Sequence, residues 1–393
     1  MNNSKGFNTL CQTGSGKDKL LGHIATPMCP STAFVFPETQ IGAKRAADIH
    51  EPEFYGRWGN HNTHEFEDLI AALEGAGAAV STSSGLAIIS MVLHTFLKSG
   101  DHMVAPYACY SESKILIDRL AEQMGITVDY VDSDNLQQYI SASRQNTKLI
   151  YAETPANPTI SLVDIKQLSA HCKTLNDCVF VVDSTFASPF NQVPLTLGAD
   201  IALHSATKYI GGHSDVVAGV AAGSKFLIDK VRKTFSFHGP HLEAFSAYQL
   251  CRGIRTLGLR MERQNNNGLA IANWLHDNSA IETISYPYHP SHPQYELAKQ
   301  QMKGGGGMLC FTTKNGRSAA EKIISNTKLI KMAVSLGGVT STITHPASMT
   351  HNLLSDEELN AAGITSNMIR FSIGVEDSND LIADLDQAIK SHG

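Results

Sequence analysis

One lysine and one aspartate stand directly after two apolar segments of the chain. Asp183 follows Cys178–Val182, and Lys208 follows Ile201–Leu203 at the end of a Ser-Ala-Thr-Lys sequence. The apolar segments predict neighbouring strands of a buried parallel sheet, whose polar ends meet at the edge where open α/β sheets bind ligands. A lysine there can form a Schiff base with an aldehyde, and an acid beside it can keep a pyridine nitrogen protonated. The pair therefore predicts an enzyme that uses pyridoxal 5'-phosphate (PLP).

A serine-rich turn supplies a second feature of such a site. Ala78–Val80 has the pattern of a strand, Ser81–Gly85 that of a turn, and Leu86–Leu97 that of a helix. A helix that opens directly after a strand presents free backbone N–H groups and the positive end of its dipole, which together suit a phosphate. Serine is equally a common helix cap, so the turn indicates a phosphate site only in combination with Lys208 and Asp183.

Other chemistries have partial signatures in the chain. The segment from Ser205 to Lys208 matches the Ser-x-x-Lys of acyl-serine hydrolases, but no Ser-Asp-Asn follows it and Lys-Thr-Gly is absent. His345 and His351 are separated by Pro346, so they cannot share a helix face as paired metal ligands do. No glycine-rich nucleotide-binding motif follows a predicted strand. We therefore expect no metal site and neither a nucleoside triphosphate nor a dinucleotide.

The pattern of elements divides the chain into three regions. Strands and helices alternate from Ala78 to Gly223, which predicts an α/β fold with a doubly wound, mostly parallel sheet, preceded by a helix that Thr63 caps. A long helix at Arg252–Arg263 then leads to a smaller α+β region, which begins with a separate helix at Gly268–Asp277. We expect an N-terminal arm (1–59) that contacts a partner subunit, a large PLP-binding α/β domain (60–255) and a C-terminal α+β domain (256–393).

The last predicted strand, Met368–Gly374, alternates in polarity. Ile369, Phe371 and Ile373 fall on one face, and Arg370 falls on the other. We therefore expect the three apolar side chains to face the core and Arg370 to face away from it.

Composition restricts the classes of partner. The 393 residues include 31 basic and 37 acidic side chains, a net charge of −6, and there is no basic run, which argues against nucleic-acid binding. The longest nearly apolar stretch, Leu86–Leu97, falls well short of the roughly 20 residues that span a bilayer. The first residues lack the apolar core of a signal peptide. The seven cysteines contain no Cys-x-x-Cys pair, which favours a cytoplasmic protein with reduced thiols.

Several motifs together resemble the Cys/Met-metabolism (γ-) family of PLP-dependent enzymes. They are Ser205–Tyr209, Asp183, the Glu153–Pro158 turn, Ser335–Gly338 and His345–His351, and the likeness runs from about Tyr55 to the C-terminus. The resemblance implies the type I (aspartate-aminotransferase-like) PLP fold and a homotetramer built as a dimer of catalytic dimers. It also implies a small amino acid as substrate.

The resemblance also implies roles for individual residues. Lys208 would carry PLP and move protons, Asp183 would pair with the ring nitrogen, and Tyr110 would stack on the ring and act as a catalytic acid. The phosphate would be held by Ser84, Gly85, Leu86, Ser205 and Thr207, with Tyr55 and Arg57 reaching it from the partner subunit. Asn157 would bond the 3' oxygen of PLP, and Arg370, assisted by Ser335, would clamp the α-carboxylate of the substrate.

The choice of reaction within the family depends on two positions. Val334 is apolar where cystathionine γ-synthases and γ-lyases tend to have glutamate, which favours a methionine γ-lyase-like enzyme that releases thiol, 2-oxobutanoate and ammonia. Glu112 departs from that pattern, because methionine γ-lyases have cysteine there, and the motif that begins at Tyr55 looks more like that of bacterial cystathionine β-lyases. A cystathionine β- or γ-lyase is therefore the alternative, followed by a γ-replacing cystathionine γ-synthase or O-acylhomoserine sulfhydrylase. The fold alone also permits an aminotransferase. A catalytically inactive binding protein is a further alternative, against which the presence of Lys208 and Asp183 argues.

Overall fold

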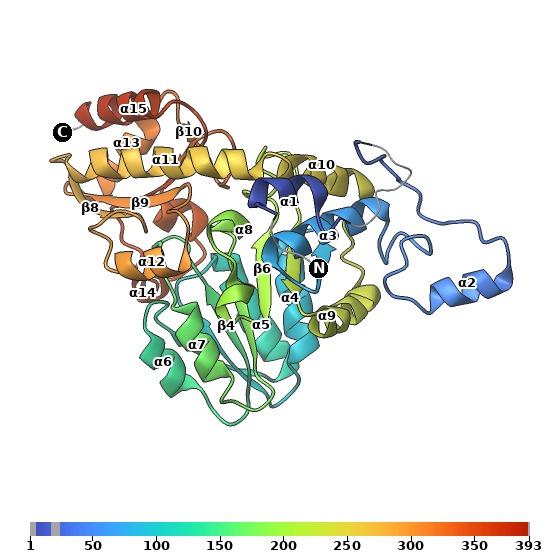
Figure 1. The fold of residues 1–393 in the computed structure, drawn as a ribbon. Coiled ribbons are helices and arrows are strands. Elements are labelled where there is room, and N and C mark those ends of the chain that lie inside the picture. Colours follow the sequence, from blue (N-terminus) through green and yellow to red (C-terminus); the bar gives the residue numbers. More distant parts are fainter. Residues whose placement is uncertain (1–4, 17–23, 392–393) are drawn as a thin grey trace.

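A computed structural model of the chain describes residues 5–16 and 24–391, and within these residues two β-sheets are present (Figure 1). The larger sheet has seven strands in the order β1-β7-β6-β5-β4-β2-β3. The strands are β1 (Ala78–Thr82), β2 (His102–Pro106), β3 (Thr127–Val131), β4 (Thr147–Glu153), β5 (Val179–Asp183), β6 (Ile201–Ser205) and β7 (Gly219–Gly223). Neighbouring strands from β6 to β3 pair in parallel, whereas β7 runs antiparallel to both β6 and β1. The predicted doubly wound, mostly parallel sheet is therefore present.

Both faces of this sheet are apolar, because alternate residues of each strand point to opposite sides. On β4, Leu149 and Tyr151 join the cluster beneath α4 and α9, while Ile150 and Ala152 join the cluster beneath α6 and α7. Helices cover both faces, as parallel sheets require. These helices are α3 (His61–Glu74), α4 (Gly85–Phe96), α5 (Ser111–Met124), α6 (Leu136–Ala142), α7 (Ile165–Cys172), α8 (Ser188–Asn191), α9 (Lys225–His238) and α10 (Ala244–Ile254).

The start of α3 differs from the prediction by three residues. Asn60, not Thr63, caps the helix: its side chain accepts hydrogen bonds from the N–H groups of Asn62 and Thr63. Thr63 is the reciprocal partner, since its Oγ1 accepts from the Asn60 N–H at 2.8 Å. Threonine stands here at the third helical position, where glutamate or glutamine is usual in a capping box. The capping box is therefore hard to recognise from the sequence, and the prediction took Thr63 for the cap itself.

The long helix α11 (Leu257–His276) also differs from the prediction, which had separate helices at Arg252–Arg263 and from Gly268 (Figure 1). Gly268 does not break α11. A Cβ at this position would lie 2.5 Å from the Tyr286 hydroxyl and 2.8 Å from the Gly306 carbonyl. The glycine therefore permits close packing of α11 on the following region.

The smaller sheet has five strands within the described residues, in the order β10-β11-β12-β9-β8. These strands are β8 (Ile281–Ser285), β9 (Met308–Thr313), β10 (Lys331–Met332), β11 (Thr342–Thr344) and β12 (Met368–Ser372), and the helices beside them are α12 (Tyr295–Gln301), α13 (Gly316–Asn326), α14 (Asp356–Ala361) and α15 (Ser378–Lys390). Ile369, Phe371 and Ile373 lie in the apolar core of this region, as predicted, whereas Arg370 faces away from that core.

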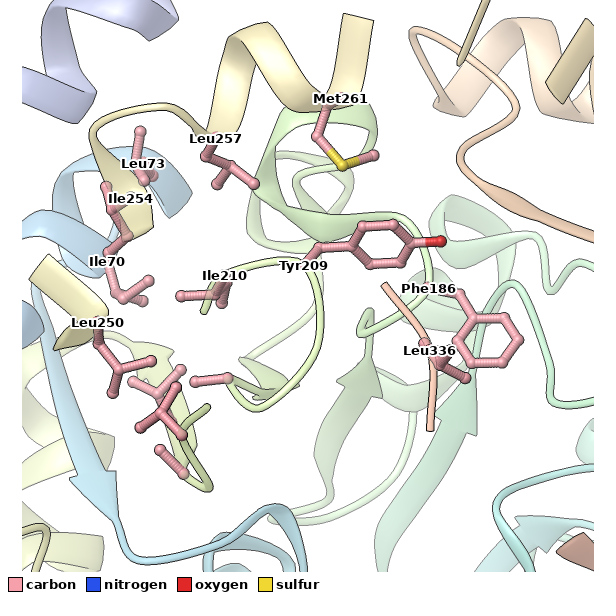
Figure 2. Close-up of a cluster of buried hydrophobic side chains, with 14 of the residues drawn as sticks. Ile70, Leu73, Phe186, Tyr209, Ile210, Leu250, Ile254, Leu257, Met261 and Leu336 are labelled. Atoms are coloured by element: carbon pink, nitrogen blue, oxygen red, sulfur yellow. The ribbon is translucent and has the colours of Figure 1, made fainter. Parts of the chain in front are cut away.

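The segment that follows Lys208 is anchored in a third apolar cluster (Figure 2). Tyr209 and Ile210 are buried there with Leu257 and Met261 of α11. The guanidinium of Arg260 donates to the Tyr209 carbonyl at 2.6 Å. Lys208 thus extends from a backbone that is fixed by both packing and hydrogen bonds.

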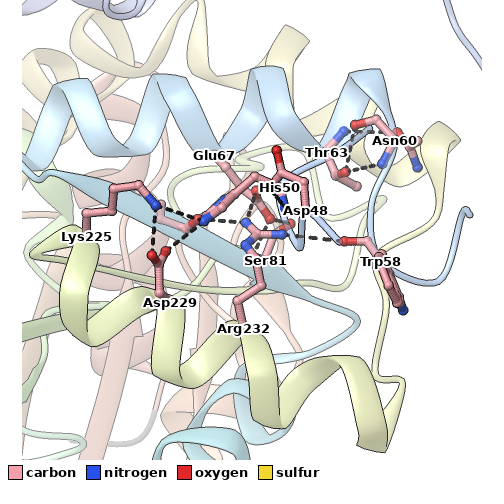
Figure 3. Close-up of polar contacts among 11 residues, drawn as sticks. Asp48, His50, Trp58, Asn60, Thr63, Glu67, Ser81, Lys225, Asp229 and Arg232 are labelled. Carbon is pink, nitrogen blue, oxygen red and sulfur yellow. Dashed lines mark hydrogen bonds and ion pairs between the residues drawn. The ribbon is translucent and has the colours of Figure 1, made fainter. Parts of the chain in front are cut away.

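The N-terminal region contains two short helices that the sequence did not predict. Helix α1 (Phe7–Thr13) packs on α3 and α11 and buries Cys11, whereas α2 (Thr39–Ala46) has no buried residue and projects away from the body (Figure 1). Between α2 and α3, His50 Nε2 lies 2.7 Å from Asp229 Oδ1 of α9 (Figure 3). Residues 1–4 and 17–23 of the predicted arm lie outside the described residues. Across the described ranges, no helix is long and apolar enough to cross a membrane.

Candidate active site

A cavity of about 380 Å³ lies where β4, β5 and β6 end, and it collects nearly all of the predicted site residues. Those that line it are Ser84, Gly85, Leu86, Tyr110, Glu112, Asn157, Asp183, Ser205, Thr207, Lys208, Val334, Ser335 and Arg370. Tyr55 and Arg57 do not line it. Arg57 instead donates to the Ser236 carbonyl of α9, and its guanidinium lies 5.7 Å from the centre of the Tyr55 ring.

Lys208 enters the cavity from the residues that follow β6. Its Nζ donates to Ser335 Oγ at 3.2 Å, so Ser335, which the resemblance implies as a helper of Arg370, also contacts the lysine. Burial, and after it the positive charge of Arg370, lowers the pKa of Lys208 to about 8. A larger fraction of neutral amine is therefore present near neutral pH than for an exposed lysine, and the neutral amine is the nucleophilic form.

Asp183 is the last residue of β5, and its carboxylate is already oriented. Oδ1 accepts from the Thr185 N–H at 3.0 Å and from Thr185 Oγ1 at 2.5 Å, and the Tyr151 hydroxyl donates to Oδ2 at 3.3 Å. Burial raises the pKa of Asp183, while the two bonds from Thr185 oppose that rise. A buried carboxylate held in this way can stabilise a protonated ring nitrogen.

The start of α4 forms another part of the cavity wall. Ser84 caps the helix by accepting from the Ala87 N–H at 3.1 Å, and the N–H groups of Gly85 and Leu86 precede the first intrahelical hydrogen bond. A Cβ on Gly85 would lie 3.0 Å from the Ser205 Cβ, so glycine allows the helix start to contact β6. Backbone N–H groups, two hydroxyl residues and a positive dipole end suit a phosphate group.

Arg370 lies on β12, in the smaller sheet, and is only 3% exposed. Its Nη1 donates to Asn157 Oδ1 at 2.8 Å, so the structure pairs Asn157 with the arginine. Burial lowers the pKa of Arg370, but an arginine keeps its charge in proteins. Its planar guanidinium can bind a carboxylate through two parallel hydrogen bonds.

Tyr110 and Glu112 occupy the start of α5. Tyr110 is 39% exposed, and burial together with the neighbouring Glu112 carboxylate raises its pKa to about 12. The hydroxyl therefore keeps its proton at neutral pH and can donate it. Ser111 Oγ donates to Glu112 Oε2 at 2.7 Å and thereby orients that carboxylate, while Val334 lines the same cavity and is 59% exposed.

Some lining residues were not predicted as site residues. They are Ile89, Ser113, Glu153, Thr185, Phe186, Val217, Leu336, Met349 and Thr350. Glu153 carried the same signal as Asp183, since it is an acid at the end of an apolar strand. Burial raises the pKa of Glu153 to about 8, with the charge of Asp183 as the next cause. Of the apolar members, Leu336 and Met349 lie within the Ser335–Gly338 and His345–His351 motifs, whereas Ile89, Phe186 and Val217 lie outside the quoted motifs.

The residues present fit PLP. Lys208 offers an amine, Asp183 a buried acid, and the start of α4 a place for a phosphate. Gly219 makes room for the α4 start as well, because a Cβ there would lie 2.2 Å from the Ser84 carbonyl.

The chain resembles known proteins along nearly its whole length. The family described as Cys/Met metabolism PLP-dependent enzyme matches residues 8–390. An L-methionine gamma-lyase of Fusobacterium nucleatum subsp. polymorphum is 41% identical over 377 residues, which cover 94% of each chain. A cystathionine gamma-lyase of Dictyostelium discoideum is 38% identical, and the matched region covers 99% of this chain and 98% of that enzyme. The crystal structure of metB from Corynebacterium glutamicum has a TM-score of 0.92 and 37% sequence identity to this chain. The match covers 100% of this chain and 99% of the metB chain. This last likeness confirms the fold class predicted from the sequence.

The position of Arg370 next to Lys208 predicts a measurable pH dependence. In cofactor-free protein, acylation of Lys208 by acetic anhydride should follow a titration with a midpoint near pH 8, because the neutral amine predominates above the lowered pKa. Arg370→Met should move that midpoint upward, since it removes a positive charge that disfavours the ammonium. Peptide mass spectrometry measures the extent of labelling.

Arg317→Met is the matched control, because Arg317 is exposed and pairs with Glu321 at 2.8 Å. It should leave the midpoint of Lys208 unchanged. An unchanged midpoint in Arg370→Met would contradict the assignment of the shift to Arg370.

Proposed function

The chain belongs to the Cys/Met metabolism family of PLP-dependent enzymes, and we propose that within this family it is a methionine γ-lyase. In this proposal, α,γ-elimination converts L-methionine and water to methanethiol, 2-oxobutanoate and ammonia. The main observation that supports this proposal is that Lys208, Asp183 and Arg370 line one cavity. Apolar Val334 and Leu336 line the same cavity. An apolar wall suits the methylthio end of methionine, and relatives at about 40% identity are named L-methionine gamma-lyases.

Each side chain has a distinct task in this proposal. Arg370 binds the α-carboxylate of the substrate and so fixes the position of its α-carbon. The bound cofactor supplies an electron sink that lets the α-proton leave. Lys208, as the neutral amine, accepts that proton and moves it, and Asp183 keeps the ring nitrogen protonated. The Tyr110 hydroxyl retains its proton at neutral pH and donates it to the departing sulfur.

The cofactor itself would be held at three places. Lys208 would hold its aldehyde carbon, Asp183 its ring nitrogen, and the start of α4 its phosphate, together with Ser205 and Thr207. Thr207 Oγ1 accepts from the Ala218 N–H at 3.0 Å, which fixes the loop that follows Lys208 against the start of β7.

Separate assays with methionine, homocysteine, cysteine and cystathionine test the reaction. Methionine should give 2-oxobutanoate at the highest kcat/KM, and Lys208→Ala should reduce turnover by at least about a thousandfold, because it removes the group that moves the proton. Chromatography identifies the 2-oxo acid that each substrate gives. 2-Oxobutanoate indicates γ-elimination, and pyruvate indicates β-elimination. Pyruvate from cystathionine as the main product would replace this proposal with a cystathionine β-lyase.

A cystathionine lyase is the second candidate, and Glu112 is the observation that favours it. Of the carboxylates that line the cavity, Glu153 and Asp183 accept backbone N–H bonds, whereas Glu112 accepts from the side-chain hydroxyl of Ser111. A carboxylate in this position can pair with the distal ammonium group of cystathionine, which methionine lacks. A γ-replacing synthase or sulfhydrylase ranks third, because it requires a second substrate in the same cavity.

Replacement of Glu112 separates the first two candidates. If Glu112 binds a distal ammonium, Glu112→Gln should lower kcat/KM for cystathionine by about tenfold, the value of one charged hydrogen bond, and leave methionine within about twofold. Glu112→Cys should shift the preference further towards methionine. Glu122→Gln, on the exposed side of the same helix, is the control. Equal effects on both substrates would show that Glu112 does not select between them.

We further propose that the active enzyme is a homotetramer built from catalytic dimers, in which residues 1–59 contact the partner subunit. Helix α2 has no buried residue, and the segment around it exposes apolar side chains such as Val35, which is 92% exposed. Such a segment fits an intersubunit contact. Tyr55 and Arg57 lie at its base and would complete the phosphate site of the partner.

Mixing two inactive variants tests this arrangement. Arg57→Ala and Lys208→Ala each remove a group from a different subunit of a shared site. Subunit exchange at equal concentrations should restore about a quarter of the wild-type activity, since half of the dimers are mixed and each has one intact site. Light scattering confirms assembly. No recovery in a preparation that has exchanged subunits would place Arg57 and Lys208 in the same subunit's site.

A cytoplasmic location completes the proposal. All seven cysteines are free thiols in the structure, and reduced cysteines are typical of that compartment.

A further inference from the structure

Glu153 is a buried acid in the cavity wall that has no role in the proposed reaction so far. It ends β4, is 4% exposed, and lies opposite Asp183 in the register of β4 and β5. A second carboxyl group beside Asp183 in a buried wall raises the free energy of the folded state, because burial and the neighbouring Asp183 carboxylate both disfavour its ionised form. A residue that is unfavourable for stability at this position calls for a functional explanation.

The two oxygens of Glu153 bind two different loops. Oε2 accepts from the Tyr110 N–H at 3.0 Å, and Oε1 accepts from the Asn157 N–H at 3.0 Å. The first loop follows β2 and begins α5, whereas the second is the turn after β4. One rigid carboxylate therefore sets the distance between the backbone of the proposed acid and the backbone of Asn157.

Asn157 extends this connection to the smaller sheet. Its side-chain Oδ1 accepts from Arg370 Nη1 at 2.8 Å. A chain of three hydrogen bonds thus joins Tyr110 to Arg370 through Glu153. These residues come from different elements, and Asn157 and Arg370 are 213 positions apart in the sequence.

Only a carboxylate can make both of these backbone bonds. Glutamine has nearly the same shape, but one of its terminal atoms is an NH₂ donor, which cannot accept from an N–H group. With glutamine at this position, either Tyr110 or Asn157 loses its partner.

We propose that Glu153 is a positioning residue, which holds Tyr110 and Arg370 at the separation that an amino-acid substrate needs. In the proposed roles Arg370 binds the α-carboxylate and Tyr110 donates to the sulfur, so the distance between them has to fit the substrate from its carboxylate to its sulfur. The inference rests on the proposed roles of these two residues but not on the identity of the thiol that leaves.

Binding measurements on Glu153→Gln test it. We expect the Kd of PLP for the cofactor-free protein to stay within about threefold of wild type, because Lys208, Asp183 and the start of α4 are unchanged. The Kd of the holoenzyme for glycine, followed by the cofactor absorbance, should rise by about tenfold or more, the value of one charged hydrogen bond that a misplaced Arg370 loses. Glycine carries the α-amine and α-carboxylate without a leaving group, so a wrong choice of sulfur substrate does not affect this result.

Asp384→Asn is the matched control. Asp384 is also buried, and its carboxylate accepts backbone N–H bonds from Lys328, Leu329 and Ile330, but it does not line the cavity. This variant should lower the unfolding temperature and leave both Kd values unchanged. If Glu153→Gln behaves like Asp384→Asn, or if it weakens PLP and glycine binding equally, Glu153 has a structural role only and the proposal fails.

Glu153→Asp decides the question if the glutamine variant does not fold. Aspartate keeps both acceptor oxygens but is shorter by one methylene. The loops of Tyr110 and Asn157 must therefore move towards β4, or one of the two hydrogen bonds is lost. Glycine should then bind about tenfold more weakly while PLP binding persists. Wild-type affinity for glycine in this variant would overturn the proposal.

Discussion

Because β4, β5 and β6 pair in parallel, all three strands end at the same edge of the larger sheet. Register aligns Glu153 with Asp183, and the next strand delivers Lys208 a few residues beyond Leu203. Evenly slanted hydrogen bonds hold this alignment, and the apolar clusters on both faces prevent the strands from sliding, because a shift by one residue would expose one face of each strand. The distance between acid and lysine therefore follows from the sheet as a whole.

Desolvation dominates the electrostatics of the cavity that results. Three carboxylates and two cations line it, and burial is the first cause of the pKa shifts of Lys208, Glu153 and Asp183. Like charges then reinforce the effect: Arg370 lowers the pKa of Lys208, and Asp183 raises that of Glu153. Both shifts favour neutral forms in the cavity, so a lysine can react as an amine near neutral pH while Arg370 keeps its charge for the substrate.

The site spans two regions that pack through α11 and the cluster around Tyr209 (Figure 2). The larger sheet supplies the groups that we propose for the cofactor, and the smaller sheet supplies Arg370, which we propose for the substrate carboxylate. Their relative position is set by the hydrogen bond between Arg370 and Asn157 and by contacts such as that of Ser111 Oγ with the Thr350 carbonyl at 2.8 Å.

The sequence by itself determined the alternating architecture, the strand ends that carry Asp183 and Lys208, the serine turn before α4 and the inward face of β12. Each of these depends on local periodicity or on the residues next to a strand, which neighbouring positions already encode. Tertiary structure alone decided the antiparallel course of β7, the continuity of α11 through Gly268, and the partners of Ser335 and Asn157. It also decided the place of Glu153, whose partners lie 43 positions before it and 4 after it. Such contacts join segments that only the folded chain brings together, so no local pattern could specify them.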